Sequence, residues 1–142
     1  MMHLFSITQR VYIEHTDAGG VVYHSNYLNF MERARTDFVR LCGYEHCKTS
    51  VEDGFIFVVH SLDIRYKSPL QMDEEIVIAL DVQELKRSSI TFAQYIYHKQ
   101  DMRLAASAAV RVCSVSSRTL KPQAIPVKIF NRISEKTTAN SL

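Results

Sequence analysis

One stretch constrains the fold of this chain more than any other: a loop with two adjacent glycines, followed by a long helical pattern. Ser25 and Asn26 stand where the helix would begin, and both side chains can accept hydrogen bonds from the unpaired N–H groups of a first turn. The apolar residues that recur at helical spacing are Tyr27, Leu28, Met31, Ala34, Phe38 and Leu41. The pattern predicts a helix from near His24 to Gly43, roughly 25 Å long at about 1.5 Å per residue. In a chain of 142 residues, this helix has to be the main packing partner of the other elements.

The rest of the chain mostly alternates apolar and polar residues, which is typical of strands. The strands that this pattern predicts cover residues 8–14, 55–66, 76 to about 84, 89–99 and 104–113. Small residues such as Ala106 and Ala108 in the last of them would let a helix lie close to the sheet. Because consecutive strands joined by short turns favour antiparallel pairing, we expect an α+β fold with the helix covering one face of an antiparallel sheet.

The remaining segments carry weaker patterns. Residues 44–54 are polar and irregular, with a helix-compatible stretch at Thr49–Glu52. Near the end, a short helix is expected at Val127–Ile133, and the polar tail Ser134–Leu142 is expected to be frayed. Since an open sheet leaves unpaired edge strands, we expect two copies to join their sheets edge to edge.

Composition narrows the class of protein. A hydrophobic content of 46% with 23% charged residues is typical of a soluble globular protein, and a net charge of +2 is too small to indicate nucleic-acid binding. No stretch approaches the ~18 apolar residues of a membrane span, and the start of the chain lacks a signal-peptide pattern. Three cysteines without metal-finger spacing indicate reduced thiols, so we expect a cytoplasmic protein; Cys42, His46 and Cys47 cluster but do not form a zinc motif.

The loop before the helix has the residues for carbonyl chemistry. Asp17 and His24 lie on either side of the point where the helix begins. The unpaired N–H groups and partial positive charge of a helix N-terminus can polarise a carbonyl or stabilise an oxyanion. Asp17 followed by Gly19 is equally compatible with a carboxylate that only caps a turn, and His24 with an ordinary first residue of a helix.

The residues around this loop resemble those of a known family. The run VYIEHTDAGGVVYHSNY from Val11 to Tyr27, and FMERART from Phe30 to Thr36, resemble the hotdog-fold acyl-CoA thioesterases. More narrowly, they are similar to the YbgC group associated with the bacterial Tol-Pal system, which is related to 4-hydroxybenzoyl-CoA thioesterase. The similarity extends from about Ser6 to Ile129. The motif is specific because it combines an acidic residue, glycines, a helix start and a helical signature in one continuous order.

The resemblance implies a hotdog fold, in which a curved antiparallel sheet wraps one long central helix, as a single domain over residues 1–142 with its core at about 6–130. It implies at least a homodimer with active sites at the subunit interface, and hydrolysis of an acyl-CoA thioester without a metal or other cofactor. Asp17 matches the family's catalytic aspartate, which acts as nucleophile or general base. His24 matches a position where this group carries histidine, and its backbone N–H would polarise the thioester carbonyl.

Two further positions bear on the resemblance. His15 stands where the group usually has an acidic residue, which removes any supporting carboxylate there. The run Lys86, Arg87, Ser88 and Ser89 falls at a turn where hotdog thioesterases often meet the phosphates of coenzyme A. Basic and hydroxyl side chains suit phosphate oxygens, although an ordinary solvated turn has the same composition.

Two other functions fit the same motif. A non-catalytic module could use the pocket to bind acyl-CoA or an acyl-carrier protein. A hotdog 3-hydroxyacyl dehydratase also needs a histidine and a carboxylate, although that chemistry usually places them on different elements across the dimer. The sequence does not distinguish acyl chain length, homodimer from homotetramer, or coenzyme A from acyl-carrier protein.

Overall fold

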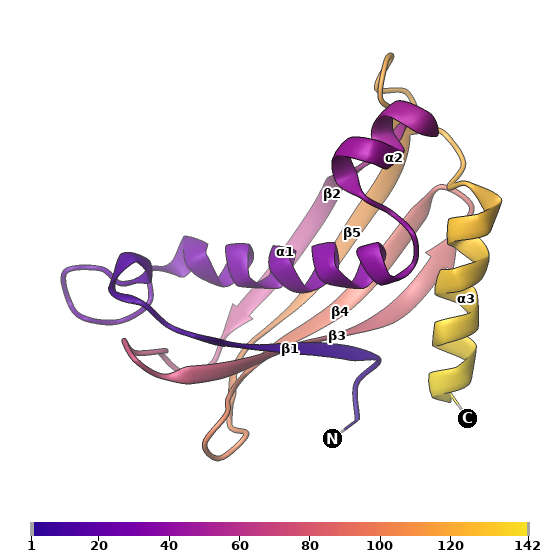
Figure 1. The fold of residues 1–142 in the computed structure, drawn as a ribbon. Coiled ribbons are helices and arrows are strands. Elements are labelled where there is room, and N and C mark those ends of the chain that lie inside the picture. The colour runs from indigo at the N-terminus through magenta and orange to yellow at the C-terminus, as the bar shows by residue number, and fades with distance from the viewer. Residues whose placement is uncertain (1, 142) are drawn as a thin grey trace.

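The computed structural model describes residues 2–141, without the side chains of residues 46 and 139–141, and shows a five-stranded antiparallel sheet crossed by a long helix, α1 (Figure 1). The strands are β1 (Phe5–Arg10), β2 (Phe55–Tyr66), β3 (Glu75–Lys86), β4 (Ser89–His98) and β5 (Leu104–Ser116). Their order across the sheet is β1-β3-β4-β5-β2, and every neighbouring pair is antiparallel. The predicted hotdog architecture is therefore confirmed, with β1 and β2 as the two edges.

The helix α1 (His24–Leu41) begins and ends where the sequence predicts. Its buried side chains are Tyr27, Phe30, Met31, Ala34, Phe38 and Val39. They belong to one buried cluster with Phe92, Ala106 and Val110 of the sheet, so the small side chain of Ala106 lies in the core as expected. Gly43 follows the helix with a φ of 100°, a conformation that glycine adopts without the steric cost of a Cβ atom.

The predicted strand at residues 8–14 is wrong in its second half. β1 occupies Phe5–Arg10, and Ile13–His15 instead form a short 3-10 turn. The backbone turns because His15 N donates to Tyr12 O (3.0 Å) and Thr16 N donates to Ile13 O (3.0 Å). The alternation of Val11 and Ile13 imitates a strand, but the Ile13 side chain is 74% exposed.

The two other helices extend beyond the bounds that the sequence predicts. α2 covers His46–Glu52 instead of Thr49–Glu52, and α3 covers Val127–Ser141 instead of ending at Ile133. Ile129 and Ile133, one helical turn apart, are buried in the core, and Thr137 Oγ1 donates to Ile133 O (2.8 Å). Residues 134–141 of the tail that was expected to be frayed therefore continue the helix, which stands beside the end of α1 (Figure 1), while Leu142 lies outside the described residues.

Candidate active site

A tight turn builds the loop that carries Asp17. The Asp17 N–H donates to Val21 O (2.9 Å), and the Gly20 N–H donates to Asp17 O (3.1 Å). Gly20 has a φ of 85°, which a residue with a Cβ rarely adopts. Asp17 Oδ1 accepts from Gly19 N (2.8 Å) and from Val21 N (3.4 Å). One carboxylate oxygen therefore stabilises the turn, as the capping interpretation predicts, while the residue as a whole stays exposed.

His24 is the first residue of α1, and its side chain is exposed. Its ring lies against that of Tyr23, with 4.3 Å between the ring centroids. Asp17 and His24 thus lie at the same end of α1, but no hydrogen bond joins them in the part of the chain that the structure describes. Within one chain, Asp17 and His24 therefore both lie beside the start of α1 without bonding to each other.

The prediction that Ser25 or Asn26 caps α1 is wrong. The residue that precedes the helix is Tyr23, and no side-chain hydrogen bond caps this end among the described residues. Ser25 and Asn26 already lie inside the helix, and Asn26 Nδ2 donates instead to His15 O (2.8 Å). The amides of the first turn are consequently not covered by a capping side chain.

His15 occupies the position where an acidic residue was expected. Its side chain is buried, and its Nδ1 accepts from Tyr12 N (2.9 Å), while the ring packs edge-on against Phe30. Burial lowers the pKa of His15, so the neutral form with its proton on Nε2 is favoured. His15 O also accepts from Tyr23 N (2.9 Å). His15 therefore stabilises the segment that leads into α1, a role that no periodic pattern in the sequence indicates.

The turn of Lys86, Arg87, Ser88 and Ser89 connects β3 to β4. Arg87 O accepts from Ile125 N (2.9 Å) and Ser88 O accepts from Ser114 N (2.8 Å), so the backbone of the turn is fixed beside the segment that leads into α3. Lys86 pairs with Glu84 (3.3 Å), and Ser89 is buried. This turn lies away from the start of α1 (Figure 1), so a single chain does not bring these four residues to Asp17.

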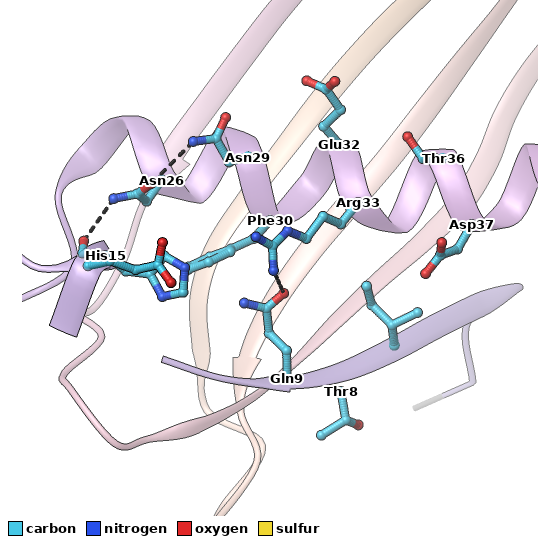
Figure 2. A pocket seen from close by; sticks show the side chains of 12 residues that line it. Thr8, Gln9, His15, Asn26, Asn29, Phe30, Glu32, Arg33, Thr36 and Asp37 are labelled. Atoms are coloured by element: carbon cyan, nitrogen blue, oxygen red, sulfur yellow. Dashed lines mark hydrogen bonds between the residues drawn. The ribbon is translucent and has the colours of Figure 1, made fainter. Parts of the chain in front are cut away.

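Neither of two hollows on the chain is lined by Asp17 or His24. A hollow of about 810 Å³ lies between β1 and α1, where Arg33 Nη1 donates to Gln9 Oε1 (3.2 Å) across it (Figure 2). Its lining is polar and includes His15 and Asn26. A smaller hollow of about 100 Å³ lies beneath α1 beside β2, and it is lined mainly by apolar side chains such as Phe57 and Val59. Asp17 therefore lies outside both of these hollows.

Metal-binding clusters and membrane-spanning helices are both absent from the described residues. No three His, Cys, Asp or Glu residues among the described ones lie where they could hold a metal ion. Of the Cys42, His46 and Cys47 cluster, the His46 side chain lies outside the described residues. Within residues 2–141, no helix has both the length and the apolar character needed to cross a membrane.

Comparisons with known proteins agree with this architecture. The family model of the thioesterase-like superfamily matches residues 11–133. The chain is 37% identical over 125 residues to the acyl-CoA thioesterase YbgC of Haemophilus influenzae, covering 88% of this chain and 90% of that protein. It is 34% identical over 126 residues to the acyl-CoA thioester hydrolase YbgC of Escherichia coli, covering 89% and 92% respectively.

Solved structures show the same fold. A probable thioesterase from Bartonella henselae is 31% identical, with a TM-score of 0.72, and the match covers 85% of this chain and 96% of that one. A Staphylococcus aureus protein solved in complex with CoA has a TM-score of 0.89 at 17% identity, over 94% of this chain and 84% of its own. The chain therefore belongs to the thioesterase-like superfamily, with YbgC thioesterases among its relatives, and is a thioester hydrolase with the hotdog fold.

Proposed function

We propose that this chain hydrolyses an acyl-CoA thioester to a free acid and coenzyme A, with Asp17 as the catalytic carboxylate. The supporting observation is the position of Asp17 at the uncapped start of α1, where one carboxylate oxygen is held by Gly19 N–H and Val21 N–H. The relatives named as acyl-CoA thioesterases match over most of the chain, which supports the same substrate class here.

The chemistry has two possible forms at Asp17. As a general base, the carboxylate takes a proton from a water molecule that attacks the thioester carbonyl. As a nucleophile, it attacks the carbonyl itself, expels the coenzyme A thiolate and forms a mixed anhydride that water then hydrolyses. In both forms negative charge develops on the carbonyl oxygen, and the first N–H groups of α1, beginning with that of His24, are the donors proposed to stabilise it.

A second copy of the chain would complete this site. β2 is an edge strand whose exposed apolar side chains include Val59 (54% exposed) and Leu62 (41% exposed). An unpaired apolar edge of this kind favours pairing with another strand. In a two-fold pairing about the middle of β2, the Tyr66 end of one copy meets the Phe57 end of the other.

This pairing would bring the separated candidate residues together. Tyr66 Oη donates to His24 O (3.2 Å), so the start of α1 accompanies the Tyr66 end of β2. Phe57 pairs with Ser114, whose N–H donates to Ser88 O (2.8 Å), so the β3–β4 turn accompanies the Phe57 end. The Asp17 loop of one copy would therefore face Lys86, Arg87, Ser88 and Ser89 of the other, where those residues would contact the coenzyme A phosphates.

The test is release of free thiol from a panel of short aliphatic, long aliphatic and aromatic acyl-CoA thioesters. Asp17→Asn keeps an acceptor for Gly19 N–H but cannot act as base or nucleophile, so we expect kcat to fall about 100-fold or more with an unchanged circular dichroism spectrum. Thiol release by Asp17→Asn at the wild-type rate would exclude this mechanism.

Thiol release, together with measurements of binding and of unsaturated product, separates the two other functions. A non-catalytic acyl-binding module would bind acyl-CoA or an acyl-carrier protein without releasing thiol. A dehydratase would convert 3-hydroxyacyl-CoA to an unsaturated product and leave the thioester intact. Running the panel with acyl groups on coenzyme A and on an acyl-carrier protein also determines which carrier the protein prefers.

A further inference from the structure

Four side chains meet at a polar cluster apart from Asp17. His98, at the end of β4, is buried, and its Nε2 lies 2.7 Å from Ser68 Oγ. Its Nδ1 forms a hydrogen bond with Glu74 Oε1. Arg103 Nη2 lies 3.4 Å from the same Nε2 atom. Serine, histidine and carboxylate are thus arranged in the order of a hydrolytic triad.

The surroundings of Ser68 favour a structural link over a nucleophile. Its hydroxyl also donates to Leu104 O (3.0 Å), which anchors it to β5. Its N–H donates to Ala105 O (3.1 Å) and is not available to stabilise an oxyanion. The cluster therefore holds segments of the backbone in place.

His98 connects the two ends of the loop between β2 and β3. Ser68 stands at the start of residues 68–74 and Glu74 at their end, and both bond to the one imidazole. Glu74 uses its second oxygen, Oε2, to accept from Gln71 N (3.0 Å) in the middle of the loop. The conformation of residues 68–74 thus depends on His98.

Residues 68–74 in turn support the loop that carries Asp17. Leu70 O accepts from Val22 N (2.8 Å), and Gln71 forms an antiparallel bridge with Val21. Val21 is bonded to Asp17 through both its O (2.9 Å) and its N–H (3.4 Å). Leu70 N also donates to the hydroxyl of Tyr27 (3.1 Å) in the first turns of α1. A continuous series of hydrogen bonds therefore runs from His98 to the carboxylate and to the helix start.

We propose that His98 is a positioning residue for the proposed hydrolysis: through Ser68 and Glu74 it fixes residues 68–74, which hold Asp17 in register with the first amides of α1. This inference rests on the proposed function. Because His98 contacts neither the Asp17 carboxylate nor the helix amides, its loss affects the orientation of the reacting groups more than substrate binding, and so lowers kcat more than it raises KM.

The chain contains a matched control for this proposal. His3 has the same kind of partners: its Nδ1 lies 2.7 Å from Asp81 Oδ2 and its Nε2 lies 2.8 Å from Tyr97 Oη. The two side-chain bonds of His3 thus join the start of the chain to β3 and β4, and their partners, Asp81 and Tyr97, lie outside residues 68–74. His3→Ala therefore removes a histidine bound to a carboxylate and a hydroxyl without touching the Asp17 loop.

The experiment compares wild type, His98→Ala, Ser68→Ala and His3→Ala by steady-state thiol release and by hydrogen–deuterium exchange of peptides covering residues 17–22. We expect His98→Ala to lower kcat about tenfold with KM within about twofold, and to speed exchange in this segment. Ser68→Ala, the milder variant, should show the same pattern with a smaller fall in kcat if His98→Ala folds poorly. His3→Ala should leave kcat and exchange in this segment at wild-type values.

Two results would overturn the proposal. One is wild-type exchange in residues 17–22 for both His98→Ala and Ser68→Ala. The other is a fall in kcat for His3→Ala equal to that for His98→Ala, which would mean that general destabilisation causes the loss. Failure of the proposed function is distinguishable, because it would appear as wild-type thiol release by Asp17→Asn, whereas the exchange measurement does not depend on turnover.

Discussion

The hydroxyl of Tyr66 donates a hydrogen bond to the carbonyl oxygen of His24 over 3.2 Å. This bond joins the last residue of edge strand β2 to the first residue of α1. The Tyr66 ring also packs edge-on against the ring of Tyr27, with 5.0 Å between centroids. The strand proposed to pair with a second copy and the helix start proposed to stabilise the oxyanion are therefore connected directly.

Tyr66→Phe tests this connection. The variant keeps the ring contact with Tyr27 and loses only the bond to His24 O, so the free energy of unfolding should fall by about 1 kcal/mol or less. Because the bond positions the helix start, kcat should fall by about two- to fivefold with KM nearly unchanged. Urea unfolding and steady-state thiol release measure the two effects, and a rise in KM at constant kcat would contradict the positioning role.

Leu62→Lys tests whether β2 is the interface between copies. Leu62 lies near the middle of the free edge, so a two-fold pairing would bring two introduced lysines close together, where like charges repel. If β2 pairs as proposed, we expect the assembly to dissociate in analytical ultracentrifugation and thiol release to fall with it, because the proposed site draws on both copies. Val51→Lys, on α2 with the Val51 side chain 82% exposed, is the control and should change neither quantity. An active Leu62→Lys monomer would show that one copy suffices.

Periodicity made α1 and most of the sheet predictable. The helix α1 buries one face, so the apolar spacing of Tyr27, Met31 and Phe38 directly reflects packing against the sheet. The same reasoning was wrong at Ile13: Val11 is buried, as a strand residue would be, but Ile13 lies in the following turn and points to solvent, and alternation over so few residues does not reveal the difference.

The candidate site was predictable only where its residues are close in the sequence. Asp17 and His24 stand at the start of α1 as predicted, because a loop and the helix that follows it stay adjacent. Ser68, Glu74 and His98 were missed, since the register of β3 with β4 brings them together from distant positions and nothing in their local spacing indicates it. Nothing in the sequence indicates how far the β3–β4 turn lies from the start of α1, because the order of the strands in the sheet decides it (Figure 1).

The stability of the protein should depend on the protonation of His15. Because burial lowers the pKa of His15 in the folded state below its ordinary value of 6.5, the unfolded chain binds the proton more readily. The contribution of neutral His15 is therefore fully present above about pH 6.5 and is lost as the pH falls through the lower pKa of the folded state. Protonation of Nδ1 would also remove the acceptor for Tyr12 N–H.

His15→Asn isolates this effect, because the asparagine side-chain oxygen can accept from Tyr12 N–H without titrating. We expect the free energy of unfolding of the wild type to fall more steeply than that of His15→Asn between pH 7 and pH 5, as measured by urea denaturation at several pH values. Near pH 8, where His15 is neutral in both states, the difference in free energy of unfolding between the two proteins should not change with pH. This difference reflects the lost contact between the His15 ring and Phe30. Parallel pH profiles for the two proteins would mean that His15 does not titrate differently in the folded and unfolded states.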